Sequence, residues 1–356
     1  SNEEFYGGDL QGIINRLDYL ADIGINGIYL TPIFEANTSH KYDTKNYRKI
    51  DPHFGDETIF KNLVDAAHEK GIRIMLDGVF NHCGNQFAPW LDVLEKGPDS
   101  KYFNWFMINK WPFNKEDHNT KDGSFYSFAF TSRMPKLNTN NPEVIQYLLE
   151  VVEYWVKNFD IDGLRLDVAN EVSHRFCKDL RRLTKELKPD FYILGEIWHD
   201  AITWLHDTNR LIDKVKDIDI FYQQLAVLFT MPGSPCIYYG TELAMEGSYD
   251  PDCRRCMPWE DIDKGLYKDR IEIVKALIHL RKANKAFKSR HFHFIEDKNN
   301  PRVIHYIKTD EDQSQVEVIL NCSRESIVVK RKGNELFILL NADTILKPKG
   351  VFIQQI

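Results

Sequence analysis

The feature that most constrains this 356-residue chain is a repeated order of amphipathic helix and short apolar strand. The spacing of apolar residues predicts helices over residues 9–23, 56–70, 142–158, 173–187, about 211–230 and about 267–285. The first five are followed by the strand-like segments INGIYLTPIF (25–34), IRIMLDGVF (72–80), IDGLRLDVA (161–169), FYILGEIW (191–198) and PCIYYG (235–240). Repeated helix–strand units indicate a parallel sheet with helices outside it, either doubly wound or closed into a (β/α)8 barrel.

Two regions break this alternation. About 55 residues between NHCG and NNPEV are rich in Trp, Phe, Asn and Asp and have no clean period, which is typical of a functional insertion. After about Phe287 the pattern changes to short alternating runs such as RVIHYIKT and QVEVILNC. These runs predict a small antiparallel β domain at the C-terminus.

Composition excludes two classes of partner. The formal net charge is −7 and no basic cluster occurs, which argues against nucleic acid. No apolar run approaches the ~18 residues that cross a membrane. The six cysteines are scattered, which favours free thiols and a cytoplasmic location. Cys253 and Cys256 form one C-x-x-C pair, but no second pair or suitable histidine spacing supports zinc.

The segment GLRLDVANE (163–171) places two opposite charges on one face of a predicted strand. Arg165 and Asp167 point the same way, because side chains alternate along a strand. A buried salt bridge would explain the pair, although such a pair is weak evidence of stability. Other strands also end in polar residues, namely Asp77, Asn81 and His82, and Glu196, Trp198 and His199. Since the carboxyl ends of parallel strands form one face, we expect these groups to converge on an active site.

Four motifs carry a family resemblance. They are DGVFNH (77–82), GLRLDVANE (163–171), GEIWHD (195–200) and HDTNR (206–210). Together and in this order they resemble the alpha-amylase superfamily, glycoside hydrolase family 13. VANE, MPKLN (134–138) and DPDCRRCM (250–257) are similar to the subgroup of cyclomaltodextrinase, neopullulanase and maltogenic amylase.

The resemblance implies a (β/α)8 TIM barrel with a loop domain inserted after the third strand and a C-terminal antiparallel β domain. We assign 1–82 and 142–286 to the barrel, 83–141 to the insertion and 287–356 to the β domain. Only five barrel strands are found, ending near Phe34, Phe80, Ala169, Trp198 and Gly240, whereas a barrel needs eight. We therefore expect residues of the natural chain to be absent between Leu205 and His206, and before Ser1.

For the chemistry, the resemblance implies three carboxylates. Asp167 would be the nucleophile, Glu196 the general acid/base and Asp207 the stabiliser of the transition state. A retaining glycosidase needs two carboxyl groups ~5–5.5 Å apart, one ionised and one protonated. Arg165 is expected to lower the pKa of Asp167 and keep it charged. The apolar neighbours Ile197, Trp198 and Tyr192 are expected to desolvate Glu196 and raise its pKa.

The resemblance also implies contacts with a sugar. His82 and His206 would hydrogen-bond the sugar at the cleavage subsite, and Tyr42 of HKYDT would stack on its ring. The next donor subsite would involve Asp250 and Arg254, and the acceptor side Glu171 and Trp198. Without the motifs, His82 would be interpreted as a core histidine and Tyr42 as surface packing.

We therefore expect a retaining hydrolase of α-1,4-glucosidic bonds, with some α-1,6 cleavage or transfer. Its partners would be α-glucans: maltooligosaccharides, cyclodextrins, pullulan or starch. An oligosaccharide α-1,6-glucosidase or ordinary α-amylase is the alternative, and MPKLN and VANE count against both. A non-enzymatic scaffold is disfavoured, because Asp167, Glu196 and Asp207 are all present.

No redox or organic cofactor is expected, but YGGDL resembles a segment that supplies calcium ligands, here Gly7 and Asp9. Calcium takes six to eight oxygens, and the other ligands would precede Ser1. The subgroup usually has an N-terminal β-sandwich domain that supports dimerisation, and nothing here corresponds to it. A homodimer is therefore expected only if an upstream domain exists.

Overall fold

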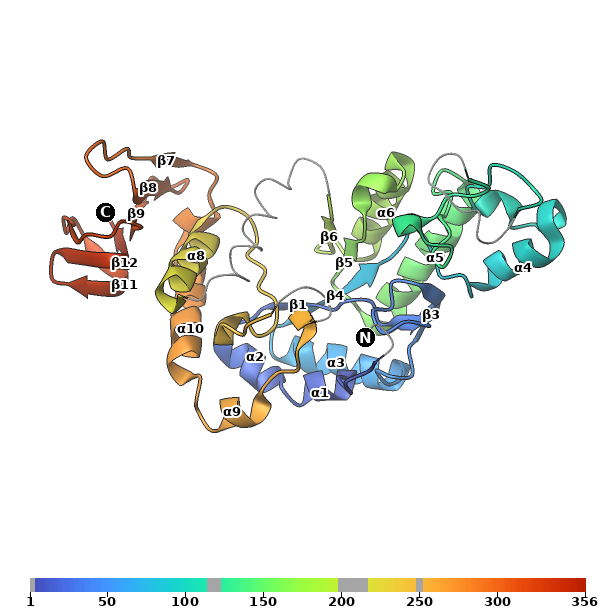
Figure 1. Cartoon of the computed structure of the whole chain (residues 1–356), viewed down its shortest axis with the longest axis horizontal. Helices are drawn as coiled ribbons and strands as arrows, with labels where there is room; N and C mark the ends of the chain where they lie inside the picture. The colour runs from blue at the N-terminus through green and yellow to red at the C-terminus, as the bar shows by residue number, and fades with distance from the viewer. Residues whose placement is uncertain (1–3, 114–122, 198–216, 248–251) are drawn as a thin grey trace. The chain divides into compact units, whose positions relative to one another are not determined.

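The computed structural model describes residues 4–113, 123–197, 217–247 and 252–356. The chain divides into two compact units, Ser1–Thr203 and Trp204–Ile356, which are coloured blue to green and yellow to red in Figure 1. Each unit is described by itself. Within the described residues, no helix is both long and apolar enough to cross a membrane.

A parallel sheet organises the first unit. Its described strands lie in the order β1 (Gly27–Tyr29), β4 (Arg73–Gly78), β5 (Gly163–Leu166) and β6 (Tyr192–Gly195), and each pair is parallel. The register places Asp77 beside Arg165 and Arg165 beside Leu194. The carboxyl ends of β4, β5 and β6 therefore meet at one edge, as the alternation of helix and strand predicts.

Helices precede these strands in the chain, as the periodicity predicts. They are α1 (Leu10–Ile14), α2 (Leu17–Ile23), α3 (Glu57–Glu69), α5 (Pro142–Phe159) and α6 (His174–Leu187). A polar residue caps the start of each of the helices α3, α5 and α6. The side chains of Asp56, Asn141 and Ser173 each accept a hydrogen bond from a backbone N–H in the first turn. α1 packs on α3, and α5 packs on α6.

Two expected elements at the N-terminus differ from the structure. The helix expected over 9–23 is broken, because Arg16 has φ −117° and its N–H bonds to the Ile13 carbonyl, only three residues back. The strand expected over 25–34 ends at Tyr29, because Pro32 has no N–H to extend the ladder. The chain instead forms β2 (Phe34–Ala36), which pairs with β3 (Thr44–Ile50) in an antiparallel ribbon.

The segment expected to be an insertion contains little regular structure. It forms α4 (Ala88–Lys96) and the short 3-10 helices η1 (Gly97–Asp99), η2 (Phe103–Trp105) and η3 (Phe128–Phe130). Isolated bridges hold it together, including one between His82 and Lys136 and one between Phe106 and Leu137. The first of these bridges ties MPKLN to the segment that follows β4.

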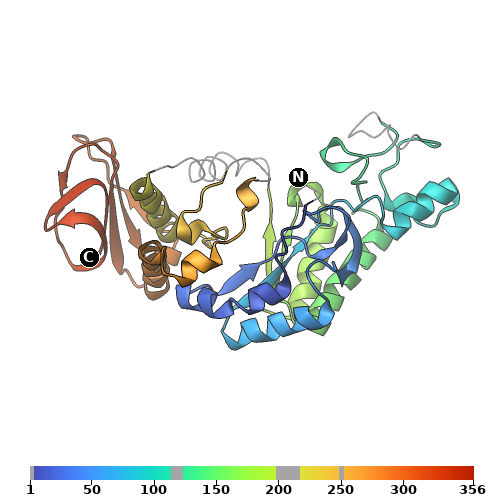
Figure 2. The same cartoon turned by 60° about the horizontal axis from the view of Figure 1, so that its bottom comes forward.

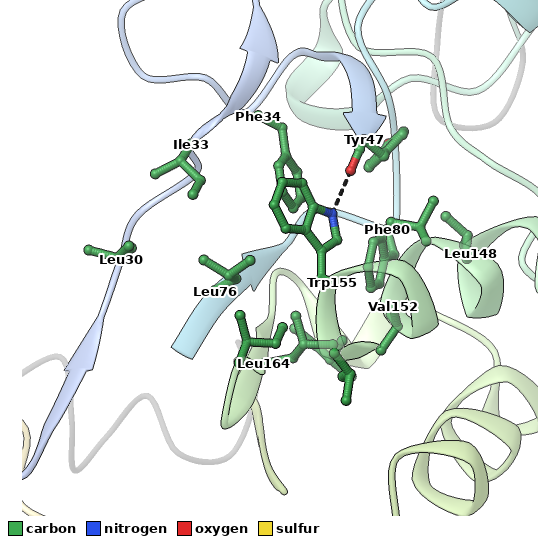
Figure 3. Close-up of a cluster of buried hydrophobic side chains, with 14 of the residues drawn as sticks. Leu30, Ile33, Phe34, Tyr47, Leu76, Phe80, Leu148, Val152, Trp155 and Leu164 are labelled. Atoms are coloured by element: carbon green, nitrogen blue, oxygen red, sulfur yellow. Dashed lines mark hydrogen bonds between the residues drawn. The ribbon is translucent and has the colours of Figure 1, made fainter. Parts of the chain in front are cut away.

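An aromatic cluster forms the core of the first unit (Figure 3). Trp155 of α5 is buried, and its indole N–H donates to the Tyr47 carbonyl over 2.8 Å. Phe34 stacks on Trp155 with ring centroids 5.1 Å apart, and Phe60 meets it edge-on at 5.5 Å. Leu76 and further aliphatic side chains of the sheet complete the cluster, which fixes the sheet against α5.

The second unit combines helices with an antiparallel sheet, as predicted for the C-terminus. Its described strands are β7 (Phe292–Phe294), β8 (Val303–Thr309), β9 (Gln315–Asn321), β10 (Ile327–Val328), β11 (Asn334–Ala342) and β12 (Ile345–Gln355). The order is β10-β12-β9-β8-β7, and β11 pairs with β12. Among its helices, α8 (Ile218–Thr230) lies against β12, and α10 (Lys268–Ala283) packs on α8 (Figure 2). The short helices η5 (Thr241–Leu243), η6 (Asp252–Arg254), α9 (Trp259–Asp263) and η7 (Lys285–Lys288) connect these elements.

The prediction of a strand at PCIYYG (235–240) is wrong. Residues 235–238 form no strand, and none of the described strands pairs with them. A parallel strand requires a hydrogen-bonding neighbour. Without one, Tyr238 is 51% exposed and the chain turns at Gly240, where φ is +82°, into η5.

Candidate active site

One guanidinium joins three carboxylates at the carboxyl edge of the parallel sheet. Nη1 of Arg165 donates to Oδ1 of Asp167 over 2.7 Å and to Oδ2 of Asp77 over 3.0 Å. Nη2 of Arg165 lies 2.9 Å from Oε1 of Glu196. Asp77 lies near the end of β4, and Asp167 and Glu196 come directly after β5 and β6. The predicted convergence of these strand ends is therefore confirmed for the described residues.

The two carboxylate oxygens of Asp167 differ in their hydrogen bonding. Arg165 holds Oδ1, whereas Oδ2 is buried and accepts no hydrogen bond from the described residues. A buried acceptor without a partner is costly. Oδ2 is therefore the oxygen of Asp167 that is not engaged by any of the described residues.

The charge state of Asp167 differs from the expectation. Burial first, and then the negative charges of Asp77 and Glu196, raise the pKa of Asp167 to about 7, although Arg165 opposes them. A single guanidinium shared by three carboxylates cannot neutralise all of them. The expectation that Arg165 keeps the pKa of Asp167 low is therefore wrong in this structure.

Glu196 is held on both carboxylate oxygens. Oε1 contacts Arg165, and Oε2 accepts the backbone N–H of Val168 over 3.0 Å. Its side chain is 33% exposed, and the neighbouring Tyr192 and Ile197 are exposed too. The expected apolar enclosure of Glu196 is therefore absent among the described residues. The third expected neighbour, Trp198, lies outside them.

The residue after Asp167 has an unusual backbone. Val168 has φ +46° and ψ +50°, the left-handed region that a β-branched residue rarely adopts. In this conformation its N–H reaches Glu196, and the next N–H, of Ala169, donates to the Glu196 carbonyl over 2.9 Å. Backbone outliers of this kind cluster at functional sites.

Tyr42 and His82 lie beside the same cluster. The Tyr42 hydroxyl donates to Oδ2 of Asp77 over 3.3 Å, and Nε2 of His82 lies 3.2 Å from the Tyr42 carbonyl. Nδ1 of His82 lies 3.4 Å from the Asn81 amide nitrogen, and the Phe128 ring stacks on the imidazole at 4.4 Å. Burial is the main cause that lowers the pKa of His82 to about 3, so the ring is neutral.

Sequence reasoning missed Tyr29. Its hydroxyl donates to Oδ2 of Asp77 over 2.5 Å, and its ring lies 5.9 Å from the Arg165 guanidinium carbon. Burial and the charge of Asp77 raise the pKa of Tyr29 well above its usual value. Its position at the carboxyl end of β1 is the signal that would have found it, because the same rule identified Asp77 and Arg165.

Glu171 is joined to the MPKLN motif. Nζ of Lys136 lies 2.5 Å from Oε2 of Glu171, which is in the short helix η4 (Ala169–Glu171). Two motifs from distant parts of the sequence thus meet at η4, which follows β5 in the chain. Arg254 is exposed in η6 of the second unit, so nothing relates it to this cluster. The remaining predicted site residues, Trp198, His206, Asp207 and Asp250, lie outside the described residues.

The predicted calcium ligands do not form a complete donor set. Asp9 caps α1, with Oδ1 accepting the Gly12 N–H over 2.6 Å, and Gly7 is exposed with φ +81°. Among the described residues, no three His, Cys, Asp or Glu side chains are grouped as metal ligands. Calcium needs six to eight oxygens, so these residues alone do not fit it. Cys253 and Cys256 likewise belong to no such group in the described part of the chain.

Comparison with known proteins identifies the family. Residues 1–205 match the model of the alpha-amylase catalytic domain, so the chain belongs to the alpha-amylase family. A cyclomaltodextrinase of Geobacillus thermopakistaniensis (strain MAS1) is 45% identical over 382 residues, covering 90% of this chain and 63% of that protein. An intracellular maltogenic amylase of Bacillus subtilis is 42% identical, covering 83% of this chain and 59% of that protein.

A solved structure of a cyclomaltodextrinase is 35% identical and has a TM-score of 0.81, covering 100% of this chain and 70% of that one. Both relatives named above belong to the subgroup that VANE and MPKLN resemble. The chain spans about 60% of the length of these two curated relatives.

Proposed function

We propose that this chain is the catalytic part of a retaining glycoside hydrolase that cleaves α-1,4-glucosidic bonds in maltooligosaccharides, cyclodextrins, pullulan or starch. The observation that carries the proposal is the bridging of Asp167 and Glu196 by Arg165. Membership of the alpha-amylase family and the names of the relatives support it. Some α-1,6 cleavage or transfer would accompany the main reaction.

In the first step, Asp167 attacks the anomeric carbon with Oδ2, the oxygen that has no described partner. Glu196 gives a proton to the departing glycosidic oxygen, and a covalent glycosyl–Asp167 ester forms with inversion at that carbon. In the second step, Glu196 takes a proton from water, which attacks the anomeric carbon with a second inversion. The bond from that carbon to Oδ2 of Asp167 breaks, so the sugar leaves and the carboxylate is restored. The two inversions together retain the anomeric configuration, and no redox or organic cofactor is required.

The surrounding residues position these groups. Arg165 orients Asp167, because its position between Asp77 and Asp167 fixes the guanidinium plane. Glu196 has to leave Arg165 and gain a proton before it can act as the acid, since it is held as an ion-pair partner in the structure. Asp207, outside the described residues, would stabilise the positive charge of the transition state.

Sugar contacts are proposed at Tyr42, His82 and Glu171, together with His206, Trp198, Asp250 and Arg254. For Tyr42, the supporting observation is its contact with Asp77 at the edge of the site. For His82, a direct contact requires Phe128 to move, because the ring stacks on the imidazole and His82 is fully buried.

We also propose the domain organisation expected from the sequence: a barrel over 1–82 and 142–286, an insertion over 83–141 and a β domain over 287–356. The alignment with the cyclomaltodextrinase extends over 382 residues but includes 90% of this chain, about 320 residues. About 60 positions of that relative therefore have no counterpart here, and the family match ends at residue 205. Both observations support strands missing between Leu205 and His206, and sequencing the natural gene across this point tests the proposal.

Three further proposals concern the location, a structural metal and the oligomeric state of the protein rather than its chemistry. The name of the Bacillus subtilis relative supports a cytoplasmic location. A structural calcium at Gly7 and Asp9 would need ligands from outside the described residues, and a homodimer would need an upstream domain. Addition of a chelator to the full-length protein tests the calcium: an unchanged melting temperature contradicts it.

The decisive assay for the function compares three substrates. Wild-type protein should release reducing sugar from cyclodextrin, pullulan or starch, and proton NMR should show that the first product keeps the α configuration. Asp167→Asn should lose nearly all turnover, by ~10⁴-fold or more, while still binding maltooligosaccharides. Asp190→Asn is the matched control, because Asp190 is exposed and 3.8 Å from Arg73. An inverted first product, or no activity on any of these glucans, would refute the proposal.

A further inference from the structure

Lys41 is a fully buried lysine beside the candidate site. Its ammonium lies 2.8 Å from Oδ2 of Asp51 and 3.5 Å from the Ala36 carbonyl. Lysine is rarely buried, because removing its charge from water is costly and a single ion pair offsets that cost only with good geometry. General stability alone therefore does not explain why Lys41 is buried.

The partner of Lys41 is itself fixed by several groups. Asp51 also accepts the backbone N–H of Ala36 and of His53, each at 3.1 Å, and Nδ1 of His53 lies 2.7 Å from its Oδ1. Burial raises the pKa of Asp51, but these hydrogen bonds and that from Lys41 together hold it below its usual value. The Phe5 ring covers the ammonium at 4.6 Å. Lys41 is thus anchored to a rigid acceptor.

The backbone at Lys41 is in a left-handed conformation, with φ +61°. A residue other than glycine seldom adopts this region unless its surroundings enforce it. The effect of the conformation is to direct consecutive side chains to different places. Lys41 enters the buried pair with Asp51, while the Tyr42 hydroxyl reaches Asp77 and the Tyr42 carbonyl receives His82.

We propose that Lys41 is a positioning residue: its buried ion pair with Asp51 holds the left-handed turn and thereby places Tyr42 against Asp77 and His82. Tyr42 in turn forms one wall of the sugar site. This inference rests on the proposed function, because it assigns Tyr42 to substrate. The surface lysine Lys45 provides a natural comparison, since it pairs with Glu35 at 3.3 Å and its side chain is 42% exposed.

A double-mutant cycle separates positioning from plain stability. Lys41→Met should lower kcat/KM on maltotriose by ~10²-fold, because an ångström of misplacement costs about that much. In a Tyr42→Ala background the same change should have little further effect, as expected of residues that act as a unit. Lys45→Met should change kcat/KM less than ~2-fold, since exposed ion pairs contribute little. An equal loss from Lys41→Met in both backgrounds would overturn the inference.

A second measurement does not depend on activity. Fluorotyrosine placed at position 42 should show a shifted fluorine NMR resonance in Lys41→Met but not in Lys45→Met. An unshifted resonance in a folded Lys41→Met variant would overturn the inference, whether or not the wild type hydrolyses a glucan. A wild type that hydrolyses no glucan would contradict only the proposed function. If Lys41→Met does not fold, Lys41→Met with Asp51→Asn removes both charges and is measured in its place, with the same two outcomes.

Discussion

Arg165 donates to Oδ1 of Asp167 over 2.7 Å and leaves Oδ2 of the same carboxylate without a partner among the described residues. The arginine therefore orients the carboxylate without occupying the oxygen that the proposed reaction uses. The same guanidinium also contacts Asp77 and Glu196, so a change at Arg165 affects contacts with all three carboxylates.

Replacing Arg165 by Lys should damage both geometry and charge. A lysine ammonium cannot reproduce the planar fork that contacts three carboxylates at once. We expect kcat/KM to fall by ~10²–10³-fold, a range typical of losing a preorganised donor. The acidic limb of the pH–activity profile should move to higher pH, because losing the guanidinium contact weakens the attraction that opposes the rise in the pKa of Asp167.

Arg48→Lys is the control for this change, since Arg48 pairs with Glu150 at the surface over 3.3 Å. Its pH–activity profile should match that of the wild type. An Arg165→Lys variant that keeps the wild-type profile would contradict the role assigned to the guanidinium.

The ionised side chain of Asp167 should lower the free energy of unfolding at neutral pH. Its pKa is raised to about 7 by burial and by Asp77 and Glu196, whereas the unfolded chain has a value of ~3.9. Between about pH 4 and pH 7 the native state binds more protons than the unfolded state, so stability falls as the pH rises through this window. Asp167→Asn cannot ionise and should be more stable than the wild type near pH 8, by at most about 4 kcal/mol.

The difference between the two proteins should disappear near pH 4, where Asp167 is protonated in the native state. Thermal unfolding at several pH values measures it. A variant less stable than the wild type near pH 8 would show that the ionised form of Asp167 is favoured by the fold.

Asp162 should have the opposite pH dependence. Burial raises its pKa, but hydrogen bonds from Lys188, His68 and the Ile74 N–H outweigh burial and lower the value overall. A depressed pKa adds stability above the unfolded value of ~3.9, and that stability is lost as the pH falls through the native value.

Asp162→Asn should therefore lose about 2 kcal/mol at pH 7, because it removes the charge that Lys188 and His68 contact, although Lys188 keeps its pair with Asp160. The loss should shrink below about pH 4, and urea unfolding at the two pH values measures it. Asp190→Asn, at an exposed site, should leave both values unchanged. A loss that is independent of pH would indicate packing rather than charge.

Trp155 should stabilise the first unit without affecting chemistry directly. Trp155→Phe removes volume from the core of Figure 3 and leaves the Tyr47 carbonyl without its 2.8 Å donor. We expect the free energy of unfolding to fall by about 2–4 kcal/mol. Activity below the melting temperature should stay within ~2-fold. Tyr154→Phe, on the same helix, is the control, and equal stability of both variants would contradict the assignment.

Much of the first unit could be predicted from local patterns. The helices α3, α5 and α6 have clear periodicity, and each is preceded by a short polar residue that caps it, namely Asp56, Asn141 and Ser173. The convergence of Asp77, Arg165 and Glu196 also followed from sequence, because strand ends in a parallel sheet share one edge.

Other features depend on contacts that the sequence does not encode locally. The segment PCIYYG has a strand-like composition, but a strand forms only where it can pair with another strand. None of the described strands pairs with residues 235–238. Glu196 was expected among apolar side chains, yet Tyr192 and Ile197 are exposed. The pKa of Asp167 was expected to be low because Arg165 is two residues away. Burial, followed by the charge of Asp77, 88 residues from Arg165 in the chain, raises it instead.

The covalent intermediate on Asp167 is the most direct test of the account. The protein would be treated with a fluorinated α-glucosyl fluoride, which slows breakdown of a glycosyl–enzyme ester, and then digested for peptide mass spectrometry. We predict that the peptide containing Asp167 gains the mass of one fluoroglucosyl group, and that Asp167→Asn gains none. A label on Glu196 instead, or no label in protein that still hydrolyses maltooligosaccharides, would contradict the two-step mechanism proposed for this site.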